Sequence, residues 1–384
     1  MVGCAVNRHA QTDFSTALPG LKSEAQKSNT LASFPPGYFA LTMATGIVSL
    51  AVDYHGWKTV ARVLLALNIV AYLTLWTLTL IRFIRYPARL IHDLTHHFHS
   101  AAFLTIVAGT CVLGCQFAIL TPWISVAKAL WFAGTAFWIV LSYTFFAVIT
   151  MRHPKPPLEA GINGVWLLAV VATESVSALG IVVAPFFVRT ELALFFSLTV
   201  GMVGAMFYLF FITLILYRWM FFPMRPEKMT PDYWINMGAT AIATLSGALL
   251  LSATARWNLL QNLTPFLMGC TLAFWAMATW WIPVLLIVGL WRHGIHRVPL
   301  SYSPDYWSLV FPLGMYSAAT FLLVKITGLT FLNSLAAIFA YAALIAWSIV
   351  FLGMIRNLAR KLWRMGLFSK SPGALTRAEG IKRL

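Results

Sequence analysis

The sequence predicts an all-α integral membrane protein with ten transmembrane helices. Ten long apolar stretches follow one another along the 384 residues, and each reaches the roughly 20 residues that a helix needs to cross about 30 Å of hydrocarbon. Because these stretches are continuous and do not alternate, they exclude a transmembrane β-barrel. Hydrophobic residues make up 60% of the chain and charged residues 10%, against about 45–50% and about 25% in soluble proteins.

The apolar stretches and the segments between them predict the order and orientation of the helices. We expect helices at 35–54, 59–81, 100–120, 126–150, 160–184, 191–216, 233–253, 265–291, 305–327 and 331–355. The segments after the second, fourth, sixth and eighth helices are rich in Lys and Arg, as in Arg82, Arg85 and Arg89, whereas the opposite segments hold scattered cations. By the positive-inside rule, the basic segments and both termini face the cytoplasm. We therefore expect a multi-pass protein of the plasma or inner membrane.

One helical domain with two tails accounts for the chain. We predict a cytoplasmic N-terminal tail at 1–33, the ten-helix domain at 34–355 and a basic cytoplasmic C-terminal tail at 356–384. The first tail lacks the apolar core of a signal peptide, so the first helix acts as its own insertion signal. The net charge of +16 follows from the basic loops and from a C-terminal tail that lies on anionic membrane lipids. No nucleic-acid-binding motif accompanies it.

Two motif classes are missing from the sequence. Cys111, Cys115 and Cys270 lie in apolar helices and Cys4 in the N-terminal tail, and none forms a CxxC pair. We therefore expect small buried or lipid-facing thiols and no disulfide framework. The chain has no GxxxxGK[ST] phosphate loop, which excludes ATP-driven transport by this chain alone.

Small and bulky residues alternate from helix to helix. The odd-numbered helices carry Gly, Ser and Thr, and the even-numbered helices are rich in Trp, Phe and Tyr. Small residues let helices approach closely and their hydroxyls can line a polar path, whereas bulky side chains suit lipid and subunit contacts. The pattern predicts five helical hairpins, each giving its odd helix to an inner ring and its even helix to an outer ring. The alternative is that these small residues serve only ordinary packing. In order they are Thr42, Thr45, Gly46 and Ser49; Thr105, Gly109, Thr110 and Gly114; Thr173, Ser175, Ser177 and Gly180; Gly238, Thr240, Thr244, Ser246 and Gly247; and Ser308, Gly314, Ser317 and Thr320.

Glu174 is the acidic residue placed well inside a predicted helix. A carboxylate at that depth costs at least about 2.5–3.5 kcal/mol, so intramembrane ionisable groups are functional candidates. Three interpretations stay open: a carboxyl kept neutral by desolvation, a proton acceptor during transport, and a protonated acid that hydrogen-bonds to neighbouring hydroxyls.

The dipeptide Phe311-Pro312 lies in the first two turns of the ninth predicted helix. Pro312 has no amide hydrogen and clashes with the carbonyl four residues back, so a kink is expected there. A large ring at a kink on a pore-lining helix can close a narrow path by excluding water. The alternative is that Phe311 faces lipid or core, as most membrane phenylalanines do.

Four histidines, His92, His96, His97 and His99, stand close together after the second helix. They are similar to the histidine boxes of membrane di-iron desaturases, which makes a metal-dependent membrane enzyme the rival class. Such enzymes need several boxes, and of the other histidines only His293 and His296 are near each other. The favoured interpretation is therefore an interfacial cluster in contact with headgroups, with no metal site.

Three phrases of the sequence resemble a known family. They are PheProProGlyTyrPheAlaLeuThrMetAlaThrGlyIleValSer at 34–49, TyrTrpIleAsnMetGlyAlaThrAla at 233–241 and TyrTrpSerLeuValPheProLeuGly at 306–314. They look like the first, seventh and ninth helices of the tellurite-resistance/dicarboxylate transporter family. That family includes slow-type anion channels, bacterial tellurite-resistance proteins, fungal malate permeases and sulfite exporters. The resemblance covers about residues 34–355.

The resemblance implies five hairpins around a central pore, a homotrimer, no cofactor and transport of a small anion, as a channel or a carrier. Carried over residue by residue, the pore-occluding phenylalanine falls on Phe311, followed by Pro312. The pore wall falls on Thr45, Gly46, Gly109, Thr110, Thr173, Thr240 and Thr244, with Glu174 beside it. Glu174 departs from a neutral pore, so it is protonated, points away from the path, or couples protons to a C4-dicarboxylate or sulfite. The motifs do not distinguish chloride, nitrate, sulfite, tellurite and malate.

Overall fold

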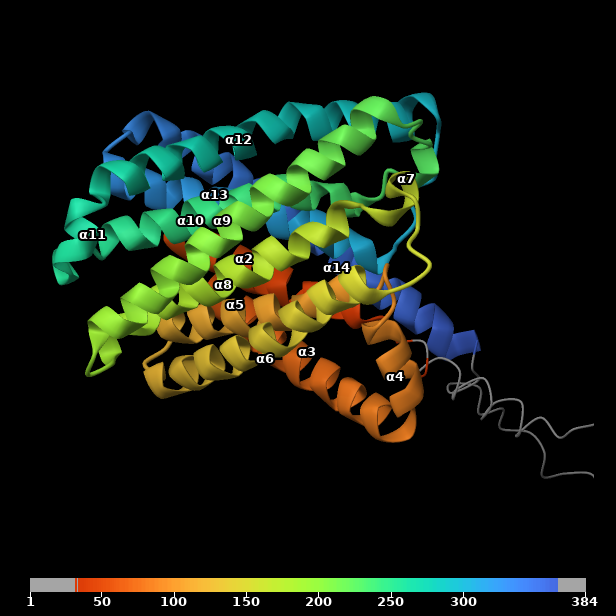
Figure 1. Ribbon diagram of the computed structural model, residues 1–384, viewed down its shortest axis with the longest axis horizontal. Coiled ribbons are helices and arrows are strands. Elements are labelled where there is room, and N and C mark those ends of the chain that lie inside the picture. Colours follow the sequence, from red (N-terminus) through yellow and green to blue (C-terminus); the bar gives the residue numbers. More distant parts are fainter. Residues whose placement is uncertain (1–31, 33, 365–384) are drawn as a thin grey trace, which may run out of the picture.

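The regular elements of the chain are helical. The computed structural model describes residue 32 and residues 34–364, and all regular elements within them are helices. The predicted N-terminal tail, Cys4 included, lies outside the described residues except for Ala32, and so do residues 365–384 of the predicted C-terminal tail. In Figure 1 the long helices run side by side along the long axis of the molecule, with α4 (Pro87–Leu94) at one end and α11 (Asn258–Asn262) at the other. The prediction of an all-α fold is confirmed.

Five long helices are each entered through a short 3₁₀ turn. These pairs are η1 (Pro36–Phe39) with α2 (Ala40–Tyr54), η2 (Ser100–Phe103) with α5 (Leu104–Leu120), η3 (Gly164–Leu167) with α8 (Leu168–Val183), η6 (Pro231–Trp234) with α10 (Ile235–Ser252), and η9 (Pro304–Tyr306) with α13 (Trp307–Thr327). Each is followed by a longer helix: α3 (Lys58–Arg85), α6 (Ile124–Met151), α9 (Thr190–Phe221), α12 (Thr264–Leu290) and α14 (Asn333–Arg364). The short α7 (Leu158–Gly161) lies in a connection. So do five further turns: η4 (Ala184–Phe186), η5 (Pro226–Lys228), η7 (Thr254–Arg256), η8 (Trp291–Ile295) and η10 (Thr330–Leu332).

Nine helices in the described part of the chain are long and apolar enough to cross a membrane. They are Lys58–Arg85, Ser100–Leu120, Ile124–Met151, Gly164–Phe186, Thr190–Phe221, Pro231–Ser252, Thr264–Ile295, Pro304–Thr327 and Thr330–Lys361. The first predicted helix forms as η1 followed by α2, whose α-helical part has 15 residues. The count of ten spans therefore stays a prediction. The last helix continues to Arg364, past the predicted boundary at 355.

The five shorter helices form a closed inner ring. α2 contacts α5, α5 contacts α8, α8 contacts α10, α10 contacts α13, and α13 returns to α2. Each longer helix packs on the inner helix that precedes it in the chain, so the molecule consists of five hairpins. The predicted division into an inner ring of odd helices and an outer ring of even helices is confirmed.

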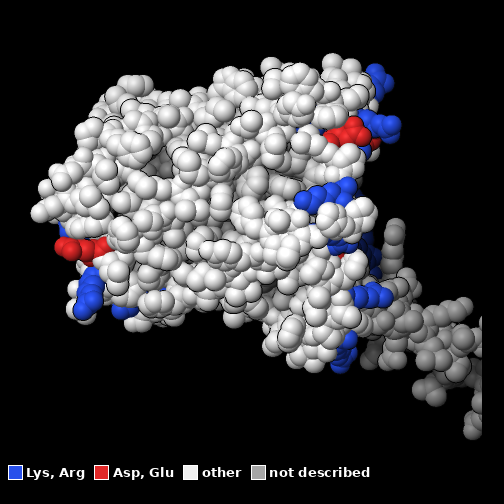
Figure 2. Space-filling model, viewed as in Figure 1, with Lys and Arg blue, Asp and Glu red and all other residues white. Residues whose placement is uncertain are grey.

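Burial and charge agree with this two-layer arrangement. In four inner helices, 72–94% of the most apolar stretch is buried, against 17–44% in the five outer helices. Bulky apolar side chains of the outer helices are exposed, as lipid contact requires. Figure 2 shows the charged side chains gathered at the two ends of the helices, with a broad uncharged band between them. The chain is a multi-pass membrane protein.

Hydrogen bonds between aromatic and threonine side chains tie the outer ring to the inner ring. Trp138 of α6 donates to Thr173 of α8 at 2.8 Å, Trp275 of α12 donates to Thr320 of α13 at 3.0 Å, and Trp347 of α14 donates to Thr45 of α2 at 2.9 Å. Tyr72 of α3 and Thr110 of α5 share a hydrogen bond of 2.9 Å. In each case the outer helix of one hairpin reaches the inner helix of the next, so we call these four contacts the aromatic clamps. They satisfy polar groups that lipid cannot.

Candidate functional site

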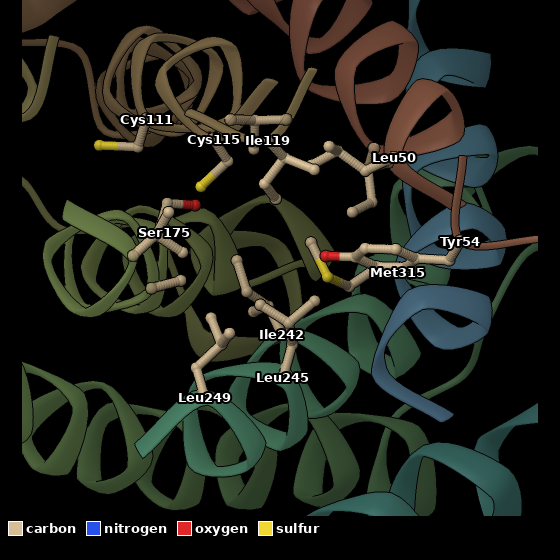
Figure 3. A pocket seen from close by; sticks show the side chains of 14 residues that line it. Leu50, Tyr54, Cys111, Cys115, Ile119, Ser175, Ile242, Leu245, Leu249 and Met315 are labelled. Carbon is tan, nitrogen blue, oxygen red and sulfur yellow. The ribbon is translucent and has the colours of Figure 1, made fainter. Parts of the chain in front are cut away.

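A narrow cavity lies on the axis of the inner ring. Its volume is about 30 Å³, which is room for about two water molecules. All five inner helices contribute to its wall (Figure 3), mostly through side chains in the C-terminal halves of these helices. The lining residues are Ile47, Leu50, Tyr54, Cys111, Val112, Cys115, Ile119, Ser175, Ala178, Val182, Ile242, Leu245, Leu249 and Met315. We call this space the axial cavity.

The wall of the axial cavity is apolar with three polar points. Figure 3 shows the Tyr54 hydroxyl, the Cys115 sulfur and the Ser175 hydroxyl directed toward the middle of the space. The Cys111 sulfur is directed away from it, because Cys111 packs on Gly134 of α6, where an added Cβ would lie 2.6 Å from that sulfur. The fourteen lining residues are all uncharged. Cys115 is thus a thiol on the axis, which refines the expectation of a buried or lipid-facing thiol.

Phe311 lies one helical turn below Met315, on the same face of α13. Met315 lines the axial cavity, so this register directs the Phe311 ring toward the axis about 6 Å closer to the N-terminal end of α13. The ring is buried, with 1% of its surface exposed. It packs on Gly238 of α10, where an added Cβ would lie 3.4 Å from Phe311 Cδ1 and 2.8 Å from Pro312 Cγ. Pro312 lies inside the continuous helix α13, and the predicted kink stays a prediction.

The same register identifies the layer around Phe311. The residue four positions before the first lining residue of each helix shares its face of the helix, which selects Met43 of α2, Val107 of α5, Val171 of α8 and Gly238 of α10. Together with Phe311 these residues are apolar and buried. An apolar constriction of this kind excludes water unless it widens.

The threonines expected in the pore wall turn their hydroxyls elsewhere. Those of Thr45, Thr110 and Thr173 form the aromatic clamps with outer helices. Thr240 donates to Met237 O at 2.8 Å, and Thr244 donates to Thr240 O at 2.9 Å, so both bond to their own helix. The physical reason is helical phase, because positions two residues before or after an axial residue lie about 160° away from it. None of these five residues lines the axial cavity within the described chain.

The remaining predicted residues lie at contacts between helices. An added Cβ on Gly46 would lie 2.5 Å from Val112 of α5, and one on Gly109 would meet the Thr42 side chain of α2, so both glycines allow α2 and α5 to approach closely. Glu174 is buried and points to α9, where an added Cβ on Gly204 would lie 2.7 Å from its Oε1. Of the alternatives open for Glu174, the geometry corresponds to a carboxyl turned away from the axis.

The five 3₁₀ turns form a second ring at the N-terminal end of the inner helices. η1 contacts η2, η2 contacts η3, η3 contacts η6, η6 contacts η9, and η9 contacts η1. A cavity of about 630 Å³ opens at this ring, with Gly37, Ala102, Val165 and Asp305 supplied by four of the turns. Arg82, Arg89, His92 and His99 also line it. We call this cavity the mouth. The N-terminal ends of the inner helices carry partial positive charge, and the wall of the mouth also includes two carboxylates, Asp93 and Asp305.

α4 is held against the mouth by an ion pair. Arg82 of α3 is buried and bonds both Asp93 of α4 and the carbonyl of Phe34. Burial raises the pKa of Asp93, but the hydrogen bond and charge of Arg82, with a smaller effect of His99, outweigh it and hold that pKa below its ordinary value. The pair therefore stays ionised at neutral pH.

The four clustered histidines have local partners. His97 Nε2 lies 3.0 Å from Gly161 O, and His99 Nδ1 lies 3.4 Å from Asp93 Oδ1. The ring centroids of His96 and His99 lie 4.6 Å apart and those of His92 and His96 5.5 Å apart, with the ring planes tilted by 33° and 35°. Among the residues that the structure describes, no group of three or more His, Cys, Asp and Glu side chains is arranged to hold a metal ion. The cluster lies at the rim of the mouth.

Sequence reasoning missed the axial residues and the ring of turns. The tetrapeptide Pro-Asp-Tyr-Trp occurs at both 231–234 and 304–307 and opens η6 and η9. This repeat could have located the start of two inner helices. Counting back four residues from Ile242 and from Met315 gives Gly238 and Phe311, but the sequence does not show that these two residues face the axis.

Comparison with known proteins gives one family and several relatives. The sequence model of the family described as SLAC1, voltage-dependent anion channel, matches residues 33–355. The sulfite efflux pump SSU1 of Trichophyton rubrum is 26% identical over 361 residues, which cover 87% of this chain and 93% of that protein. An uncharacterized transporter of Methanocaldococcus jannaschii is 23% identical over 309 residues, with 78% and 87% covered. An uncharacterized membrane protein of Mycobacterium tuberculosis is 37% identical over 163 residues, 42% of this chain and 82% of that protein.

Proposed function

Because the chain belongs to the SLAC1 family of voltage-dependent anion channels, we propose that it conducts small anions across a membrane along the axis of its inner ring. The family and the sulfite efflux relatives support anion transport. One observation carries the route: the axial cavity is the space to which all five inner helices contribute. The proposed path runs from the cytoplasmic mouth past Phe311 and through the axial cavity.

Phe311 is the proposed gate. Its ring is buried on the axial face of α13 and meets a glycine on the facing helix α10. Gly238 leaves room for the ring, and Pro312, which also touches Gly238, removes one backbone hydrogen bond at the same level. A single ring that fills an apolar layer can close a path without any charged group.

The neutral wall of the axial cavity suits conduction. A fixed cation would hold an anion tightly, whereas conduction requires binding that is weak enough for release. Positive charge is instead found at the mouth, where Arg89 is exposed. Charge at an entrance raises the local anion concentration and therefore the rate of entry.

We propose a small inorganic oxyanion as the permeant ion, with sulfite the first to test, since three relatives are sulfite efflux pumps. C4-dicarboxylates such as malate form the second class. Glu174 faces α9 and the axial cavity is lined by other residues. We therefore favour passive flux over a carrier coupled to protons through Glu174.

We further propose a homotrimer in the plasma or inner membrane, with both termini and the mouth at the cytoplasmic face. The arginines after α3 support this orientation by the positive-inside rule. The local partners of His97 and His99 favour a transporter over a metal-dependent enzyme.

Flux into liposomes tests the function. The reconstituted chain should pass sulfite, nitrate or chloride faster than empty liposomes, with and without a pH gradient. Glu174→Gln keeps the shape of the side chain and removes its titration, and it should leave the response to a pH gradient unchanged. If no anion of a panel that includes tellurite and malate crosses, the proposal fails. If flux depends on the gradient in the native chain and not in Glu174→Gln, the coupled carrier is correct.

A further inference from the structure

A second cavity opens on the outer surface between the third and fourth hairpins. Its volume is about 460 Å³, within the range of small-molecule sites in proteins. The wall comes from α8, α9, α10 and α12 and includes Met202, Phe274 and Met277. At its rim Met206 is 50% exposed and Phe266 55% exposed, so the cavity faces the hydrocarbon of the membrane. We call it the lateral cavity.

The lateral cavity lies where the fifth aromatic clamp would stand. Tyr72, Trp138 and Trp347 each stand fourteen residues after the first residue of α3, α6 and α14, and Trp275 stands eleven residues after the first residue of α12. The residue fourteen positions after the start of α9 is Gly204. At this seam a residue without a side chain thus takes the place of an aromatic side chain with a hydrogen-bond donor. A cavity of about 440 Å³ also lies at the seam between α14 and α2, but there the Trp347–Thr45 clamp forms part of its wall.

Glu174 directs an unpaired acceptor into this space. Its side chain is 2% exposed, lines the lateral cavity, and lies so close to Gly204 that any side chain there would collide with Oε1. Glu174 Oε2 has no hydrogen-bond partner among the described residues. A buried polar atom in native proteins almost always has a partner, so the geometry calls for a donor from outside the chain.

We propose that the lateral cavity binds a lipophilic aromatic molecule that carries an N–H or O–H donor, such as an indole or a phenol, with the donor on the Glu174 carboxyl. The ligand supplies the two features that the aromatic clamps supply elsewhere: an aromatic body between the hairpins and one donated hydrogen bond. The thioethers of Met202 and Met206 suit an aromatic partner.

Occupancy of this site bears on the axial wall. The Ser246 hydroxyl of α10 donates to the backbone carbonyl of Glu174 in α8 at 3.2 Å. The next residue of α8, Ser175, lines the axial cavity, and so does Leu245 of α10. A molecule seated between α9, α10 and α12 therefore contacts the two helices that form one side of the path, from the lipid side.

Cys270 provides a reporter, because it lies in α12 and lines the lateral cavity. The chain in lipid nanodiscs is alkylated with N-ethylmaleimide, and peptide mass spectrometry follows Cys270 and Cys4 separately. Indole should slow the alkylation of Cys270 at about tenfold lower concentration than 1-methylindole, which has the same shape without the donor. Alkylation of Cys4, near the N-terminus of the sequence, is the internal control and should respond equally to both probes.

Two variants assign the effect to Glu174. Glu174→Gln retains an acceptor and should keep the preference for indole, whereas Glu174→Leu should abolish it. Equal protection by the two probes in the native chain overturns the proposal, and this comparison needs no variant to fold. A Cys270 that reacts in dissociated protomers and not in the native oligomer also overturns it, since a second copy then covers the cavity. Neither result depends on whether the axis conducts anions.

Discussion

Removing the Phe311 ring should open the proposed path permanently. In the native chain the ring must leave the axis before an ion passes, which requires an unfavourable rotamer at about 0.5–1.5 kcal/mol. It also loses part of the packing of a buried phenylalanine, which is worth about 3–5 kcal/mol in full. The ring is 1% exposed and packs on Gly238, so we take about half of that packing as lost. The total is about 3 kcal/mol, or an open fraction on the order of 1 in 150.

Phe311→Ala removes this barrier, so anion flux should rise by about 100-fold. The assay measures the efflux from liposomes of an anion that quenches a fluorescent dye, and the rate is normalised to the amount of folded oligomer. Stability should fall by less than the full value for a core phenylalanine, because the space left joins the axial cavity and can hold water.

Phe145→Ala is the matched control. Phe145 of the outer helix α6 is fully buried and packs on Trp166 and Phe211. Its removal should cost about 3–5 kcal/mol of stability with no gain in flux. The reasoning is refuted if Phe311→Ala conducts like the native chain while remaining folded. It is equally refuted if Phe145→Ala raises flux as much, because the leak then comes from loosened packing.

Four further predictions test the wall, the thiol, the mouth and the topology. Ser175→Leu, on the axis, should reduce flux in the Phe311→Ala background, whereas Thr173→Val, two positions away in a clamp, should not; the opposite order would restore the threonine wall implied by the family resemblance. In Phe311→Ala vesicles a water-soluble thiol reagent applied at the cytoplasmic face should modify Cys115, and in native vesicles it should not; equal labelling would mean that the ring does not close the path. Asp93→Asn should lower the free energy of unfolding by about 1–3 kcal/mol at neutral pH. Since Arg82 lowers the pKa of Asp93 in the folded chain, the native chain should lose this contribution as pH falls below about 4. A plot of the thermal unfolding temperature against pH should therefore be flatter in that range for the variant than for the native chain. Single cysteines introduced at 85–98, 152–158, 218–231 and 292–303 should escape labelling from outside, whereas one at the exposed Val188 should react; labelling at two of the four segments would contradict the topology.

The two-layer fold could be predicted because it depends on composition alone. The composition of each helix distinguishes the two layers: small residues are frequent in α2, α5, α8, α10 and α13, and bulky residues are frequent in the helices that follow them. Each helix is long enough for this difference in composition to be clear despite single exceptions. The first span was less predictable, since Pro35 and Pro36 convert its start into a 3₁₀ turn. The length of α14 was underestimated because its last turns pass into basic sequence, which reads as a tail.

The sequence singles out Phe311 as the candidate gate, which stays a prediction, but it does not show which polar residues face the axial cavity. Phe311 is followed by a proline, and this neighbour can be read from the sequence without knowing which side of the helix the ring faces. The threonines were selected because their hydroxyls are polar. A threonine hydroxyl in an apolar ring of helices can accept a hydrogen bond from a tryptophan as readily as it can contact an ion. Thr173 and Ser175 are two residues apart and equally polar, and only the packing of α6 on α8 decides that Thr173 meets Trp138 while Ser175 meets the axis. The sequence alone does not show which side of α8 faces the axis, so it cannot distinguish these two residues.

The clamps also bear on how the path can open. Four of the five seams between neighbouring hairpins are joined by an aromatic donor and a threonine, at 2.8–3.0 Å. Widening the ring at such a seam would leave a polar group unpaired in hydrocarbon, which is costly, so at these seams a side-chain movement is cheaper than a helix movement. The seam between α9 and α10 has Gly204 in place of the aromatic residue. Two other hydrogen bonds join the third and fourth hairpins, from Trp281 of α12 to the Tyr208 hydroxyl of α9 at 2.9 Å and from Ser246 of α10 to the Glu174 carbonyl of α8 at 3.2 Å. A helix displacement would therefore break a hydrogen bond at this seam as well, and the Phe311 ring should move before the helices do.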